Sequence, residues 1–132
     1  MTRRAERRTA LDILYEADVT GRPPVEVIDE WAALGQDVPA FARDLATGVA
    51  EQLDELDALI GEHAEDWTVP RMAAVDRNIL RVAAYELLHR ADVPTGAAID
   101  EAVRAAKELS TEDSGGFVNG ILGRIAREAG RT

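Results

Sequence analysis

The chain has no cysteine, a single lysine and no apolar run long enough to cross a membrane. Without cysteine, disulfides and thiol chemistry are excluded. A membrane-spanning helix needs about 20 consecutive apolar residues, and the basic start of the chain leads into Asp12, Glu16 and Asp18 instead of the apolar segment of a signal peptide. We therefore expect a cytoplasmic protein that does not contact membranes.

Residues suited to catalysis are also few. The chain has two serines, Ser110 and Ser114, and two histidines, His63 and His89. It has no Gly-x-Ser-x-Gly turn, no phosphate loop, no dinucleotide-binding fingerprint and no paired His and Cys residues at metal-ligand spacing. We therefore predict that the protein is not an enzyme, and we expect neither a metal ion nor a cofactor.

Charge is distributed unevenly along the chain. The net charge is −10, yet Arg3, Arg4, Arg7 and Arg8 all stand within the first eight residues. At about 100° per residue these four positions span roughly 140°, so an α-helix would gather them on one side. Because the acidic remainder repels polyanions, a nucleic acid would have to bind through this local cationic site. The alternative is a frayed, solvated basic terminus.

The same helix face changes character further along. Leu11 and Leu14 lie on nearly the same side as Arg7. Leucine requires a core, whereas arginine requires water or anions. We therefore expect a helix that begins near Arg4 and overhangs the body by about two turns, or is disordered there until a ligand binds. In either case the arginines would point outward.

Apolar spacing predicts helices almost throughout and no strand, which indicates an all-α protein. The expected helices run from near Arg4 to Gly21, from Pro24 to near Gly35, from Phe41 to Ile60 as one long helix, from Met72 to Arg90, from Thr95 to Leu109, and onward from Ser114. The stretch from Ile79 to Leu88 is apolar on nearly all sides, which is typical of a central helix. A break at residues 67–70 divides one domain into sub-bundles of about residues 4–66 and 70–129.

The last helix contains an unusual number of glycines. Gly116, Gly120 and Gly123 share one face, and each costs about 1 kcal/mol relative to alanine in a helix interior. Two interpretations stay open: a neighbouring helix packs closely there, or a backbone, phosphate or base approaches the helix start. Phe117 is open in the same way, either as a core residue or as a surface on which a base stacks.

Several sequence blocks occur together in one order. They are Val75–Leu88, Ala91–Pro94, Asp100–Ala102, Ala106–Lys107, Glu112–Ser114 and Phe117–Leu122, preceded by the arginines and Ala10–Tyr15. In this combination the chain resembles the NusB family of transcription antitermination factors. The resemblance covers nearly the whole chain and is loosest between Gly21 and Trp67.

The resemblance implies an all-α fold of two packed three-helix bundles, with about seven helices, and an RNA-binding function in transcription antitermination. The implied ligand is boxA RNA in nascent ribosomal transcripts. The implied partners are a small-subunit ribosomal protein that acts as NusE and the RNA polymerase antitermination complex. Carried over by position, the RNA-binding residues would be Arg3, Arg4, Arg7, Arg8, Asp113 and Phe117. Tyr15 and Asp76 match positions that face the ribosomal protein.

The implied mechanism is binding without catalysis. Arginines would attract phosphates and stack on bases, while Phe117 and the start of the last helix contact unstacked nucleotides. Asp76 would pair with a cation of the basic ribosomal protein, whose binding then adds positive charge near the RNA.

Three alternatives stay open at this point. One is the RNA-binding domain attached to ribosomal RNA cytosine methyltransferases, which shares the helical fold. Another is a homodimer that buries the RNA-facing surface. The third is a non-catalytic helical adaptor or homodimeric interaction module with a solvated basic N-terminus.

Overall fold

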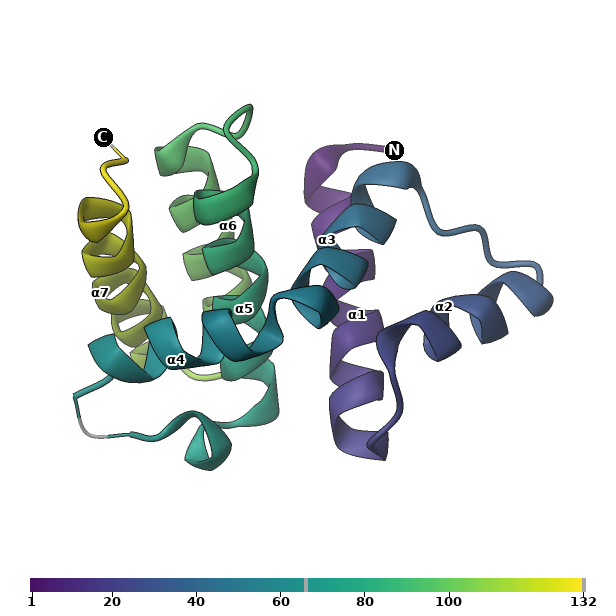
Figure 1. Ribbon diagram of the computed structural model, residues 1–132, viewed down its shortest axis with the longest axis horizontal. Coiled ribbons are helices and arrows are strands. Elements are labelled where there is room, and N and C mark those ends of the chain that lie inside the picture. Colours follow the sequence, from purple (N-terminus) through teal and green to yellow (C-terminus); the bar gives the residue numbers. More distant parts are fainter. Residues whose placement is uncertain (66, 132) are drawn as a thin grey trace.

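The computed structural model describes residues 1–65 and 67–131, and in that part of the chain every regular element is helical (Figure 1). The α-helices are α1 (Arg3–Thr20), α2 (Pro24–Ala33), α3 (Ala40–Glu51), α4 (Leu53–His63), α5 (Ala74–His89), α6 (Thr95–Leu109) and α7 (Glu112–Glu128), and the 3-10 turn η1 (Val69–Arg71) precedes α5. The predicted all-α class is confirmed. Within these residues no helix is both long and apolar enough to span a bilayer.

Helix α5 is the centre of the packing. It contacts five of the other helices, α1, α3, α4, α6 and α7. Figure 1 shows α1, α2 and α3 together at one end of the molecule and α6 and α7 at the other. Most of α5 is buried, including Ile79, Leu80, Ala84 and Leu87, so the predicted central helix is confirmed.

The predicted long helix from Phe41 to Ile60 is wrong, because the chain forms two helices there. Gln52, with φ −107° and ψ 18°, separates α3 from α4. The sequence pattern did not reveal this break because buried residues on both sides, such as Val49 and Leu56, keep helical spacing.

The break at Gln52 lets α4 cross the molecule and pack against α5 and α7 (Figure 1). Helix α4 therefore precedes residues 67–70 in the chain but packs with helices that follow them. The division into sub-bundles at residues 67–70 stays a prediction.

Gly48 of α3 lies directly against Tyr85 of α5. A Cβ atom at this position would overlap the ring of the buried Tyr85. The Tyr85 ring also lies 5.2 Å from the ring of His89, measured between centroids, which limits the space into which it could move. Gly48 is therefore required by packing and not by an unusual backbone conformation.

We predict that Gly48→Ala lowers the free energy of unfolding by about 1–3 kcal/mol, because overpacking outweighs the better helix propensity of alanine. Urea denaturation followed by circular dichroism measures the change. Gly61→Ala in α4 is the matched control, since the nearest atom to its new Cβ is Val69 Cγ2 at 3.8 Å, an ordinary contact. This control should gain up to about 1 kcal/mol. Equal stabilities of the two variants would contradict the prediction.

Candidate nucleic-acid interface

Helix α1 lies against the body of the protein from its first turn. It begins at Arg3, and the side chain of Thr2 caps it by accepting a hydrogen bond of 3.1 Å from the backbone N–H of Ala5. Further along, α1 packs against α3 and α5. The predicted overhang or disorder is therefore wrong.

Carboxylates of the protein allow the arginine-bearing face of α1 to pack against the other helices. Each of the four arginines forms an ion pair with nitrogen–oxygen distances between 2.7 and 3.1 Å. The pairs are Arg3 with Asp92, Arg4 with Glu101, Arg7 with Glu86, and Arg8 with Asp12. Three of the four partners come from α5, α6 or the turn between them. The protein itself therefore supplies the anions that these arginines need, whereas the prediction expected water or a bound ligand there.

Arg7 is largely shielded from solvent and does not point outward. Its side chain is 14% exposed and that of Glu86 is 1% exposed. The Nε and Nη2 groups of Arg7 donate to Glu86 Oε1 at 2.9 and 2.7 Å. Burial raises the pKa of the Glu86 carboxyl, and the hydrogen bonds from Arg7 oppose that rise. The pair thus joins α1 to the central helix.

A phenylalanine on α3 completes this junction. The guanidinium carbons of Arg3, Arg90 and Arg7 lie 4.4, 4.8 and 5.4 Å from the centroid of the buried Phe41 ring, within the range of cation–π attraction. Glu6 accepts a hydrogen bond of 3.2 Å from the Phe41 backbone N–H. Arg3 and Arg7 therefore help to hold α1, α3 and α5 together.

Arg4 and Arg8 are the arginines of α1 that face solvent most, with side chains 60% and 52% exposed. Arg4 donates through Nε to Glu101 Oε2 at 2.9 Å and through Nη2 to Glu101 Oε1 at 2.8 Å. This hydrogen bonding is the largest cause of a lowered pKa at the Glu101 carboxyl. Both arginines could contact an external anion, but each already has a carboxylate partner.

The start of α7 carries the other predicted RNA-binding residues. Thr111 caps the helix in a reciprocal arrangement with Ser114. Asp113 is exposed, while Phe117 is half-buried and packs against the core. Phe117 is therefore partly a core residue and partly accessible, which leaves its proposed role in base stacking untested.

The glycine face of α7 is not covered by another helix. A Cβ atom at Gly116 would have no neighbour within 4 Å among the described residues, and at Gly120 and Gly123 it would meet only Arg124 or Arg127 of α7 itself. The interpretation that a neighbouring helix packs closely there is therefore wrong. An approach by an external group remains compatible with this open surface.

The four arginines and the start of α7 lie toward opposite ends of α5. Arg7 binds Glu86 near the end of α5, whereas Ser114 of α7 donates a hydrogen bond of 3.1 Å to Asp76 near its beginning. Asp76 and Glu86 stand ten positions apart on α5, which corresponds to roughly 15 Å along the helix axis. The structure thus does not gather the predicted RNA-binding residues into one patch, and a bound strand would have to span this separation.

The two residues predicted to face a partner differ in exposure. Tyr15 is 41% exposed on α1, and Val19, one turn later, is 55% exposed. Asp76 is half-buried: its Oδ2 accepts from Ser114, and its shielded Oδ1 has no hydrogen-bond partner in residues 1–65 or 67–131. Pairing of Asp76 with an external cation stays a prediction and requires a small local opening.

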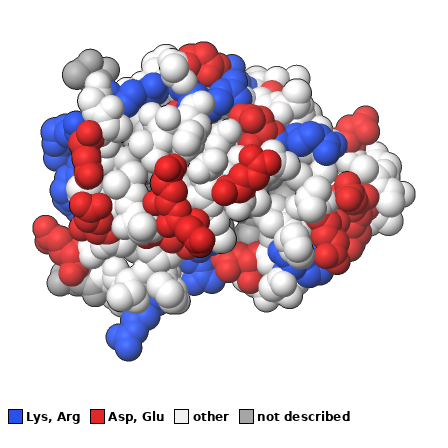
Figure 2. All heavy atoms as spheres, viewed as in Figure 1, with Lys and Arg blue, Asp and Glu red and all other residues white. Residues whose placement is uncertain are grey.

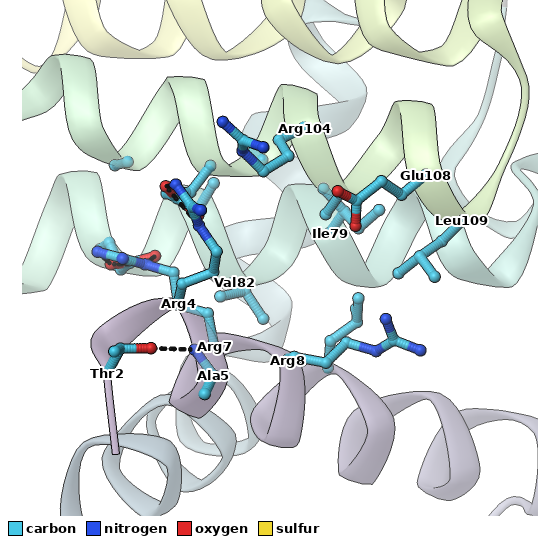
Figure 3. A pocket seen from close by; sticks show the side chains of 17 residues that line it. Thr2, Arg4, Ala5, Arg7, Arg8, Ile79, Val82, Arg104, Glu108 and Leu109 are labelled. Atoms are coloured by element: carbon cyan, nitrogen blue, oxygen red, sulfur yellow. Dashed lines mark hydrogen bonds and ion pairs between the residues drawn. The ribbon is translucent and has the colours of Figure 1, made fainter.

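Sequence reasoning missed a basic residue near Arg4 and Arg8. Arg104 on α6 is exposed and forms no ion pair with any residue in the described part of the chain. It lines a groove of 340 Å³ between α1 and α6, together with Arg4 and Arg8 (Figure 3). Only the antiparallel return of α6 along α5 brings Arg104 beside the first helix, so no local sequence signal identified it.

Acidic side chains are widespread elsewhere on the surface. Figure 2 shows them across the middle and toward both ends of the viewed face, with basic side chains mostly near its periphery. The described residues include one group with metal-ligand spacing, formed by Glu62, His63 and Glu128 at the ends of α4 and α7. Arg124 donates a hydrogen bond of 2.7 Å to the His63 carbonyl, which places a cation next to this group.

Nearly the whole chain matches one family of known proteins. The NusB family model matches residues 4–127. The transcription antitermination protein NusB of Salinispora arenicola is 50% identical, over 98% of each chain. A solved structure of T. maritima NusB superposes with a TM-score of 0.87 at 39% identity, covering 97% of this chain and 92% of that one. A structure of the antitermination factors NusB and NusE in complex with dsRNA gives a TM-score of 0.83 at 28% identity, covering 96% of each chain.

We predict that Arg7→Ala lowers the free energy of unfolding by about 3–5 kcal/mol at pH 7, because it leaves the Glu86 carboxylate buried without a partner. Chemical denaturation measures this loss. The matched control is Arg8→Ala, which removes the exposed ion pair between Arg8 and Asp12 one turn later on α1. It should lower the free energy of unfolding by about 0.5 kcal/mol or less.

The loss caused by Arg7→Ala should shrink as the pH falls. Burial raises the pKa of Glu86 in the folded state, and removing Arg7 raises it further, so the folded variant binds a proton more tightly than the unfolded chain. The variant's loss of unfolding free energy relative to wild type is therefore largest at pH values above the pKa of Glu86 in the folded variant. It decreases as the pH falls toward the range in which an ordinary glutamate titrates. A deficit that is independent of pH, or no larger than that of Arg8→Ala, would contradict a buried ion pair.

Proposed function

The chain belongs to the NusB family of transcription antitermination proteins, and from this we propose that it binds boxA RNA of nascent ribosomal transcripts together with a ribosomal protein acting as NusE. It would do so by binding alone, without catalysis, as part of the RNA polymerase antitermination complex. The observation that carries the proposal is the likeness of nearly the whole chain to NusB in a solved complex with NusE and RNA. The methyltransferase alternative gains no support, since the chain covers 98% of a NusB relative.

Phosphate binding at α1 would proceed by exchange of anions. Arg4 and Arg8 are exposed but paired with Glu101 and Asp12. An RNA phosphate gains affinity by contacting these guanidinium groups and releasing counterions, but it must displace carboxylates that already occupy them. This competition supports weak RNA binding by the free protein. Arg3 and Arg7 would contribute mainly by holding α1 in place.

The start of α7 would contact nucleotides farther along the strand. The open surface at Gly116 lets a base or sugar approach the helix backbone, and the accessible part of Phe117 offers a face for stacking. Asp113, exposed on the same helix turn, would accept hydrogen bonds from base amino groups. These contacts would select sequence, whereas the α1 arginines would supply most of the electrostatic attraction.

The ribosomal protein would bind near Tyr15 and Asp76. Tyr15 and Val19 form an exposed apolar strip on α1, which suits a protein contact. Asp76 also accepts the hydrogen bond from Ser114 that fixes the start of α7 on α5. A cation brought to Asp76 would therefore act next to the helix that carries Asp113 and Phe117.

We predict that Arg4→Ala combined with Arg8→Ala weakens boxA RNA binding and flattens its salt dependence. Each lost phosphate contact should reduce the slope of log K against log salt by about 0.7 for a single strand. Fluorescence anisotropy over a salt series measures both quantities, with a scrambled RNA of equal length to separate non-specific attraction. Arg43→Ala, which removes an exposed arginine of α3, is the matched control. An unchanged slope in the double variant would rule out phosphate binding at α1.

We also predict that Glu101→Gln tightens boxA RNA binding severalfold at low salt, because it frees Arg4 from its carboxylate partner. Asp54→Asn is the matched control: it removes one negative charge from an exposed position on α4. Comparable affinities of the two variants would show that Glu101 does not compete with RNA.

A further inference from the structure

The groove between α1 and α6 has the form of a binding site. Helix α1 forms one wall, α6 the other, and α5 the floor. Figure 3 shows Arg4 and Arg8 of α1 on one side, Arg104 of α6 on the other, and Ile79 and Val82 of α5 between them. Its volume of 340 Å³ is within the range of small-ligand sites, roughly 300–1,000 Å³.

The interior of the groove is mainly apolar. Its apolar lining consists of Ala5, Leu11, Ile79, Val82, Ala83, Ala98, Ala102, Ala105 and Leu109. Five of these nine residues are alanines, so short side chains leave a narrow space between two nearly parallel helices. Such a space suits a flat aromatic ring, which can bury both faces against apolar side chains.

Both rims of the groove carry arginine, and the α6 rim also carries Glu101 and Glu108. Arg4 and Arg8 come from α1, and Arg104 comes from α6 without an ion-pair partner among residues 1–65 and 67–131. The lining contains four arginines and three glutamates, which gives a local charge of +1 in a chain whose net charge is −10. The groove is therefore a site where an anion with an apolar, planar part is favoured over a basic protein segment.

We propose that this groove is a base-binding subsite that holds one unstacked nucleobase of the RNA. The base would lie on the apolar floor, and the phosphates on either side of it would contact Arg8 on one rim and Arg104 on the other. Glu108, also on the rim, is an acceptor for an exocyclic amino group, which favours adenine, cytosine or guanine over uracil. The inference rests on the proposed RNA-binding function and adds a subsite and a residue, Arg104, to it.

The test fills the groove and removes its unpaired cation in separate variants. Ala105→Leu adds three carbons at a half-exposed position of the wall, and Arg104→Ala removes the rim cation. The probes are synthetic single-stranded boxA RNAs, one intact and the others each carrying one abasic nucleotide, with binding followed by fluorescence anisotropy. Ala58→Leu and Arg43→Ala, at exposed positions of α4 and α3, are the matched controls.

If the groove holds a base, one abasic position should weaken binding to the wild-type protein by about 5- to 100-fold, the usual range for a lost stacking contact. Ala105→Leu should weaken binding of the intact RNA by a similar factor, and the same abasic RNA should then show no further loss. Arg104→Ala should reduce the salt slope by about 0.7. The control variants should behave as wild type.

Other outcomes would overturn the inference in distinguishable ways. If the wild-type protein prefers boxA to scrambled RNA but both groove variants retain wild-type affinity, abasic profile and salt slope, the subsite is wrong and the proposed function stands. If Ala105→Leu weakens binding of the ribosomal protein and not of RNA, a protein occupies the groove. If the wild-type protein does not distinguish boxA from scrambled RNA, the proposed function fails as well. Because Arg104 is exposed, Arg104→Ala keeps the test decisive even if Ala105→Leu impairs folding.

Discussion

The shielded ion pair between Arg7 and Glu86 fixes the arginine-bearing end of the first helix on the central helix. Two charged groups largely shielded from water must remain together, so this pair ties α1 to α5 near the end of α5, while Asp18 of α1 pairs with Arg77 and Arg81 in its first half. Phe41, under the guanidinium groups of Arg3, Arg7 and Arg90, brings α3 to the same junction. The positions of the exposed arginines, of the groove and of the exposed Tyr15 and Val19 on α1 all depend on this placement of the first helix.

The same arrangement reconciles a cationic site with an acidic protein. Carboxylates of α5, α6 and the turn between them neutralise most of the arginine cluster in the free state. Loose attraction of polyanions is thereby limited, and a nucleic acid gains affinity only where its phosphates replace carboxylates and its bases find additional contacts. Selectivity for one RNA over another would thus come as much from the free energy needed to displace these carboxylates as from the attraction between arginine and phosphate.

Sequence reasoning predicted the helical class, the central helix and the family, because periodic apolar residues and ordered sequence blocks are local signals. It failed at Gln52, where a one-residue break leaves apolar spacing intact, and at Arg7, whose partner stands 79 positions away. Arg104 and the groove were missed for the same reason, since only tertiary packing places α6 beside α1. The roles of Asp113, Phe117, Tyr15 and Asp76 came from resemblance and remain predictions.

The contacts of the first helix also impose an order on protein synthesis. Arg3 and Arg4 are synthesised before their partners Asp92 and Glu101, which stand 89 and 97 residues later in the chain. At about 5–20 residues per second, the arginines spend several seconds without their carboxylate partners. During this interval the nascent chain carries these two arginines unpaired beside an RNA-rich particle, and Glu101 becomes available only when α6 has been made.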